Sequence, residues 1–202
     1  MRGTARRISG NVLATVVLST GLAACTGGKE ESAGPCTDGT YAWSNVRRSE
    51  KLTELADPIR LKKKTASYSA RLKPVSETGV RPTVNGTPRG VRAPDVIKAL
   101  GKHLRADEPL GDPSEPDVTG HTFEAATGDL KGAYYSWRYR KEVEADFTYT
   151  CSSNAPVKGH VQTWEETGSG FLPCFSDPSE LKSGRQAARA SCPEGSKATK
   201  AS

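Results

Sequence analysis

Alternation between apolar and polar residues is strongest over residues 133–151. The odd positions there are apolar at nine of ten places, with Lys141 the exception, and the even positions after Tyr134 are polar. Successive side chains of a strand point to opposite faces, so we expect one buried face and one wet face. Because strands rarely exceed about ten residues, we predict a bend or bulge near Arg140 and Lys141, where the alternation is interrupted.

Shorter alternating runs predict the remaining strands. They cover residues 41–46, 59–61, 66–75 and 157–164, and the last of these is expected to pair antiparallel with 143–151. Thr167–Gly170 predicts a turn, followed by a third short strand that ends at Cys174. Glycine, proline and acidic residues predict loops over 76–92 and 106–120.

Two helices are predicted. Over 94–104, Pro94 suits the first helical position and the apolar residues fall on one face. Over 178–190, Asp177 is the expected N-cap, and Pro193 stops the helix. The predicted fold class is therefore α+β, mostly antiparallel sheet made of a bent long strand and a meander, with two short helices and disulfides.

A different pattern opens the chain. Three arginines precede an uncharged run at residues 11–24, which is too short to span a bilayer as a helix but has the length of a signal-peptide core. The run ends in Leu22-Ala23-Ala24-Cys25, which resembles the lipobox of bacterial lipoproteins. The resemblance implies cleavage between Ala24 and Cys25 and a diacylglycerol on the Cys25 thiol.

Two other interpretations of this leader stay open. An ordinary secretory signal would carry Cys25 by coincidence. Arg6-Arg7 also suggests a twin-arginine signal, but Ile8-Ser9-Gly10 lacks the apolar pair expected after the arginines, so general secretion is favoured. On the lipoprotein interpretation, the mature protein is held at the extracytoplasmic face of the cell membrane, because two or more acyl chains make attachment stable.

The chain then divides into four predicted segments. These are a lipoprotein signal peptide (1–24), a flexible tether (25–35), a single extracytoplasmic β-rich domain (36–193) and a disordered tail (194–202). Without the signal, the 29 basic residues fall to 26 against 23 acidic ones, so the formal net charge drops from +6 to +3. A nucleic-acid partner therefore has little support.

As a whole, the chain resembles the small lipoproteins of unassigned function found in actinomycetes. The residues that carry the resemblance are the early Cys36, Tyr41 and Trp43, together with the late cysteines. This resemblance implies no particular activity.

Four cysteines remain if Cys25 is acylated, and an even number outside the cytoplasm predicts two disulfides. We expect Cys151–Cys174 with Cys36–Cys192; the alternative is Cys36–Cys174 with Cys151–Cys192. The pair Cys174–Cys192 is least expected, because a helix over 178–190 spans about 18 Å, whereas bridged Cα atoms lie about 4.4–6.8 Å apart. No Cys-x-x-Cys spacing supports a metal site.

Motifs for catalysis are weak. Ser179-x-x-Lys182 has the spacing of the nucleophile motif in penicillin-interacting enzymes, but the partner motifs are missing or out of order, so a helix start with a surface lysine is favoured. His103, His121 and His160 have no metal-ligand spacing, and surface positions are favoured for them. We therefore predict no catalytic residue, cofactor or metal.

Three features are candidates for binding. The acidic loop 107–117 offers oxygens for Ca²⁺, although a solvated loop is favoured. Lys62-Lys63-Lys64 is suited to anionic lipid or wall polymer, although a solvated strand end is favoured. Trp164 shares its strand face with His160 and Gln162 and is a weak candidate for ligand contact.

The expected function is a membrane-anchored, non-catalytic binding or protein-interaction module at the cell envelope. Its expected partners are the membrane, through the lipid anchor, and either an envelope protein or a wall polymer. The alternative is a cell-envelope hydrolase with an unrecognised active site, which a cleft gathering a histidine with acidic residues would favour. Small-solute capture is a third reading, but the chain lacks the two-lobed organisation of transporter-linked binding proteins.

Overall fold

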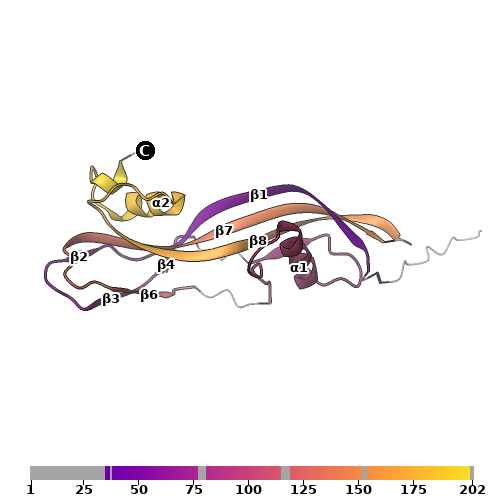
Figure 1. The fold of residues 1–202 in the computed structure, drawn as a ribbon, viewed down its shortest axis with the longest axis horizontal. Helices are drawn as coiled ribbons and strands as arrows, with labels where there is room; N and C mark the ends of the chain where they lie inside the picture. The colour runs from indigo at the N-terminus through magenta and orange to yellow at the C-terminus, as the bar shows by residue number, and fades with distance from the viewer. Residues whose placement is uncertain (1–34, 37, 77–80, 115–118, 152–153, 201–202) are drawn as a thin grey trace, which may run out of the picture. The chain divides into compact units, whose positions relative to one another are not determined.

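Three long antiparallel strands form the centre of the fold: β1 (Thr40–Leu55), β7 (Gly132–Cys151) and β8 (Asn154–Pro173), with β7 in the middle (Figure 1). We call these three strands the ribbon. The structure is a computed structural model that describes residues 35–36, 38–76, 81–114, 119–151 and 154–200. The predicted signal peptide, Cys25 and all of the tether except Pro35 lie outside these residues.

Short strands complete two sheets. In the larger sheet, β4 (Lys73–Pro74) pairs with β1, β2 (Ile59–Leu61) with β7, and β5 (Thr83–Asn85) with β8. The second sheet pairs β3 (Ser67–Arg71) with β6 (Thr122–Ala126). The α+β class with mostly antiparallel sheet is thus confirmed, while β5 lies inside a segment predicted to be loop.

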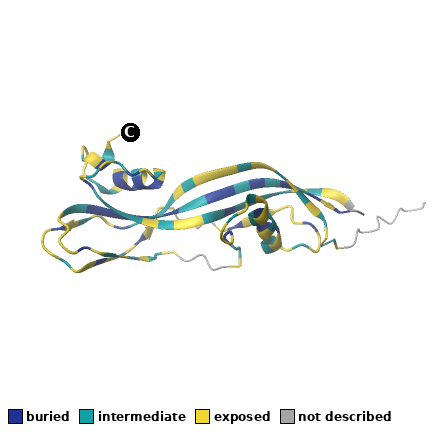
Figure 2. Cartoon of the chain, in the orientation of Figure 1, coloured by how far each residue is buried: buried dark blue, intermediate teal, exposed yellow. Residues whose placement is uncertain are grey.

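Strand β7 follows its predicted alternation from Tyr139 to Cys151 except at Glu142, which is buried. The expected wet face is wrong near the start of the strand, where Tyr134 and Ser136 are buried too, so buried residues run along its length (Figure 2). Its pairing with β8 shifts register between Lys141 and Glu142, beside the predicted irregularity. The additional residue is Glu165 of β8, because Lys141 pairs with Glu166 and Glu142 with Trp164. Such bulges let a long strand pair change its twist without ending.

The predicted turn at Thr167–Gly170 is wrong, because β8 continues through it to Pro173. The two glycines make room for aromatic rings instead. A Cβ on Gly168 would lie 2.5 Å from the Tyr139 ring, and one on Gly170 would lie 2.2 Å from the Trp137 ring. Strand β1 is also longer than predicted, because its charged residues pair across to β7: Arg47 to Glu144 at 3.0 Å and Lys51 to Glu142 at 2.5 Å.

Helix α1 (Ala93–Leu104) confirms the first predicted helix and packs on one end of the ribbon. Its buried residues meet the odd-numbered face of β7 in a cluster that includes Val96, Ile97, Leu100, Val143, Ala145, Phe147 and Val161. Arg105 ends the helix in the left-handed conformation, with φ 54°. None of the helices in the described part of the chain is long or apolar enough to cross a bilayer.

Helix α2 (Lys182–Ser191) packs on the same face of β7 at the other end of the ribbon. It begins four residues after the predicted start, with Leu181 at the N-cap. Its Ala187 and Ala188 lie in a cluster with Tyr135, Trp137 and Tyr139. Small residues on the helix let it approach these large rings closely.

The predicted disordered tail is wrong for residues 194–200. They contain the short 3₁₀ helix η1 (Lys197–Thr199), whose Ala198 is 1% exposed and donates its N–H to the Cys174 carbonyl at 3.1 Å. The segment therefore belongs to the core at the α2 end.

The even-numbered face of β7 is covered at the α2 end by the β3–β6 pair. Tyr68 stacks on Phe171 at 5.6 Å, Phe123 lies 5.7 Å from Phe171, and Tyr134 stacks on Phe171 at 5.0 Å. At this end the ribbon is therefore covered on both faces.

The disulfide pairing is Cys36–Cys151 and Cys174–Cys192, so the expected pairs are wrong. The pairing judged least favourable forms because residues 175–181 run outside the helix and carry the chain back, which brings the Cα atoms of Cys174 and Cys192 to 5.5 Å. Cys36 joins Cys151 across neighbouring strand ends with Cα atoms 6.4 Å apart. Each bridge thus closes one end of the ribbon.

Candidate functional site

A row of polar residues crosses four strands on the face of the ribbon opposite α1. Ser44 pairs with Asp146, Asp146 with His160, and His160 with Asn85. With strands about 4.8 Å apart, the row spans about 14 Å. We call these four residues the polar row.

Asn45 adds an amide to this row because its backbone is unusual. Its φ is 51°, in the left-handed region, and the β1–β7 register shifts between Ser44 and Arg47. Asparagine tolerates this region better than most residues do. The bulge turns the Asn45 side chain toward β7, where Nδ2 donates to Asp146 Oδ2 at 2.7 Å.

The other oxygen of Asp146 holds His160. His160 Nδ1 lies 2.7 Å from Asp146 Oδ1, and because an ionised carboxylate only accepts, Nδ1 carries the proton. In the neutral form of the ring, Nε2 is then an acceptor. The hydrogen bonds from Asn45 and His160, aided by electrostatic attraction to His160 and Arg47, lower the pKa of Asp146 below its ordinary value.

The polar row lines a surface hollow of about 510 Å³, together with Asn45, Thr148 and Lys158. Glycines allow the strands to meet beneath it. A Cβ on Gly159 would lie 2.4 Å from the Asn85 carbonyl oxygen, and Gly86 has φ +74°. Side chains of His160 and Asp146 are 35% and 44% exposed, so a ligand can reach both.

This set of groups can form hydrogen bonds in several directions. It combines two amides, two hydroxyls, an imidazole acceptor and the Lys158 ammonium. Hydroxyl-rich ligands match the amides and the imidazole, and an anionic group on the ligand matches Lys158. Within the described residues, no group of three or more His, Cys, Asp or Glu is arranged to hold a metal ion.

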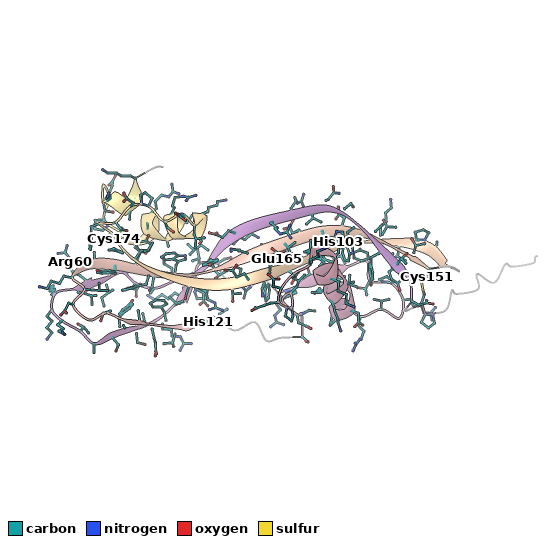
Figure 3. The ribbon with its side chains drawn as sticks, viewed as in Figure 1. Arg60, His103, His121, Cys151, Glu165 and Cys174 are labelled. Carbon is teal, nitrogen blue, oxygen red and sulfur yellow. A yellow bond between two sulfur atoms is a disulfide. The ribbon has the colours of Figure 1, made fainter. Side chains whose placement is uncertain are left out.

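The three histidines do not converge. His121 Nδ1 lies 2.9 Å from Glu54 Oε2, and the Gly120 N–H donates to Glu54 Oε1 at 2.7 Å, so this 4% exposed carboxylate holds the segment before β6 in place. His103 lies on α1 and stacks on Trp43 at 6.0 Å (Figure 3). Glu54 lies beside Arg138, eight residues along β7 from Asp146, which corresponds to about 26 Å.

The other candidates from the sequence lie outside the hollow. Trp164 is half-buried: the Arg140 guanidinium lies 4.2 Å from its ring centroid, and Gly111 packs against its ring. Ser179 is buried, and its Oγ accepts the Leu181 N–H at 3.2 Å, which is a structural role at the start of α2.

The acidic loop is described through residue 114. Asp112 there accepts hydrogen bonds from the Ser114 N–H and Oγ, which lower its pKa. Glu115 and Asp117 lie outside the described residues.

The sequence placed His160 on a polar face and missed Asp146 and Asn45. The odd–even pattern of residues 133–151 could have identified Asp146. If His160 lies on the polar face, it must pair with an even-numbered residue of 133–151, whereas a tight two-residue turn after Cys151 would pair it with the buried Ala145. The register shift between Tyr149 and Cys151 supplies the missing residue. The left-handed Asn45 has no comparable signal in the sequence.

Comparisons with known proteins give no relative: no protein-family model, no curated protein and no solved structure matches this chain.

Proposed function

We propose that this protein is an extracytoplasmic binding module, anchored by a lipid on Cys25, that binds a hydroxyl-rich, anionic wall polymer at the polar row. The anchoring half of the proposal is supported by the leader and the Leu22–Cys25 motif. The binding half is supported by one observation: the two carboxylate oxygens of Asp146 hydrogen-bond Asn45 and His160 and orient them. The remaining polar atoms of Asn45 and His160 are then available to a ligand.

Binding is tested with the full-length protein and soluble wall fragments by calorimetry. His160→Ala and Asp146→Asn should each weaken binding at least ten-fold, because the first removes an acceptor and the second releases it from its orientation. His103→Ala is the matched control, an exposed histidine beyond the hollow, and should bind normally. Equal affinities for all four proteins, or no binding by the unaltered protein, would reject the site.

The anchor is tested separately. In Cys25→Ala, the processed protein should disappear from the membrane fraction of intact cells. The variant should instead be released into the medium or accumulate as an unprocessed precursor. Retention of a processed, membrane-bound protein in this variant would contradict lipidation at Cys25.

A hydrolase is the second candidate, favoured by the His160–Asp146 pair, since carboxylates commonly orient a histidine that acts as a general base. Ser44 and Thr148 are the hydroxyls that line the hollow, and neither hydrogen-bonds His160 within the described residues. Mass spectrometry of the wall fragments after incubation decides: cleavage that His160→Ala abolishes would replace the binding module by an enzyme.

A further inference from the structure

Cations and exposed apolar side chains gather at the end of the ribbon opposite the Cys36–Cys151 disulfide. Strand β2 reaches this end at Leu61, which pairs with Gly132 at the start of β7. Figure 3 shows Arg60 at this end and Cys151 at the other. We call this surface the tip, and its residues are Arg60, Lys62, Lys63, Lys64, Leu130, Lys131 and Phe175.

Contacts within the tip join its segments into one surface. The Thr65 N–H donates to the Gly128 carbonyl at 3.1 Å, and Lys64 Nζ lies 3.2 Å from Asp129 Oδ1. Phe175 lies against Gly132, where a Cβ would come within 2.7 Å of its ring. The connections on both sides of β2 and β7 therefore present their side chains together.

The charge of the tip is largely uncompensated. Lys64 pairs with Asp129, but no carboxylate of the described residues forms an ion pair with the other four cations, Arg60, Lys62, Lys63 and Lys131. Among them lie two exposed apolar side chains, Leu130 at 37% and Phe175 at 57%. In water, these four cations have no anionic partner among the described residues, and the exposed parts of the two apolar side chains have no apolar surface to pack against.

An anionic bilayer surface satisfies both kinds. Each lysine or arginine close to anionic lipid contributes about a five-fold gain in affinity, and aromatic and aliphatic side chains are buried at the level of the headgroups. A soluble polyanion would satisfy the cations but leave Phe175 and Leu130 in water. We propose that the tip docks on anionic phospholipid headgroups, with Phe175 and Leu130 inserted between them.

This contact is independent of the polar row, which lies toward the other end of the ribbon. It gives the domain a second membrane attachment besides the N-terminal segment. Because such attraction acts within about a Debye length, it weakens as salt rises.

Lysine acetylation read by mass spectrometry tests the contact on the full-length protein. The protein is mixed with phosphatidylglycerol vesicles or phosphatidylcholine vesicles, the vesicles are floated, and bound protein is acetylated. Lys62, Lys63 and Lys131 should react at least five-fold more slowly on phosphatidylglycerol, and 0.5 M NaCl should remove the difference. Lys102 and Lys158, outside the tip, should react equally on both.

Variants separate the tip from general adhesion. In the double variant Lys62→Glu with Lys63→Glu, Lys131 should no longer be protected from acetylation on phosphatidylglycerol vesicles. In Phe175→Ser, the protection of Lys131 should be reduced. The control Lys98→Glu with Lys102→Glu, exposed on α1, should leave it intact. The proposal would be overturned if the tip lysines reacted equally on both lipids or if all lysines were protected equally. It would also be overturned if soluble polyglycerol phosphate protected the tip lysines but vesicles did not.

Discussion

The two ends of the ribbon use the same three strands in different ways. At the α2 end, α2 covers one face and the β3–β6 pair covers the other, and Trp137 is 2% exposed. At the α1 end, α1 covers one face, and the opposite face carries the polar row with His160 and Asp146 accessible. At the α2 end both faces of the ribbon are used for packing, whereas the open face at the other end keeps polar groups for a ligand.

The disulfides should show the largest difference between the ends. Cys36–Cys151 closes a loop of 115 residues and Cys174–Cys192 one of 18. Chain entropy then predicts losses of about 5 and about 3 kcal/mol when each pair is replaced by serine. Urea unfolding measures both, and peptide mapping without reductant checks the pairing. A larger loss at the α2 end would show that packing, and not loop length, sets the ranking.

Among the tryptophans, Trp137→Ala should cost about 3–5 kcal/mol, because its ring fills a fully packed site between Gly170 and Gly184. Trp164→Ala should cost less than half of that, since its ring is half-buried. Denaturant midpoints of the two variants give the comparison directly. Similar losses would mean that the centre of the ribbon is as tightly packed as its α2 end.

Glycines should respond in opposite directions at the two ends. Gly170→Ala forces a Cβ to 2.2 Å from the Trp137 ring and should cost about 1–3 kcal/mol. Gly101→Ala, inside α1, meets Leu110 at an ordinary 3.5 Å and should gain up to about 1 kcal/mol from helix propensity. Thermal unfolding of both variants checks the signs; a destabilised Gly101→Ala would show that α1 lies closer to its loop than its contacts indicate.

The smallest effect is expected from acid. The pKa of Asp146 is lowered in the folded protein, so its contribution to stability is complete above the ordinary aspartate pKa and is lost as pH falls through the lower folded value. Asp146→Asn should therefore lower stability slightly near neutrality, where the carboxylate contributes, and remove part of the pH dependence of stability below about pH 4. A carboxyl NMR titration of Asp146 that gave an ordinary or raised pKa would contradict this.

The sequence predicted the fold where one physical demand dominated. Strand β7 was predicted correctly because burial of one face imposes alternation along most of its sequence, and α1 because its apolar stripe agrees with Pro94 at its start. The turn predicted at Gly168 and Gly170 was wrong because the sequence does not distinguish a glycine that makes room for an aromatic ring from one that forms a turn. The disulfide pairing was predicted wrongly for a related reason. Pro178 was interpreted as the first turn of α2, although it lies outside the helix, so the predicted helix was too long for Cys174 and Cys192 to meet.

The candidate site was less accessible to sequence reasoning. His160 was placed on the correct kind of face, but its partner depends on the register of β7 with β8, and a single additional residue near the turn decides that register. Asn45 depends on a bulge in a strand whose charged half was not predicted as strand at all. Sites that cross strands require pairing information that alternation alone does not contain.

The distribution of the three tryptophans gives this protein its own optical reporters. Trp43 stacks on Tyr41 at the α1 end, Trp164 lies under Arg140 near the middle, and Trp137 is shielded from water at the α2 end, stacked on Tyr135. Emission from Trp137 should therefore be the bluest of the three. Variants that keep one tryptophan each would show by fluorescence whether the two ends of the ribbon melt together or one after the other.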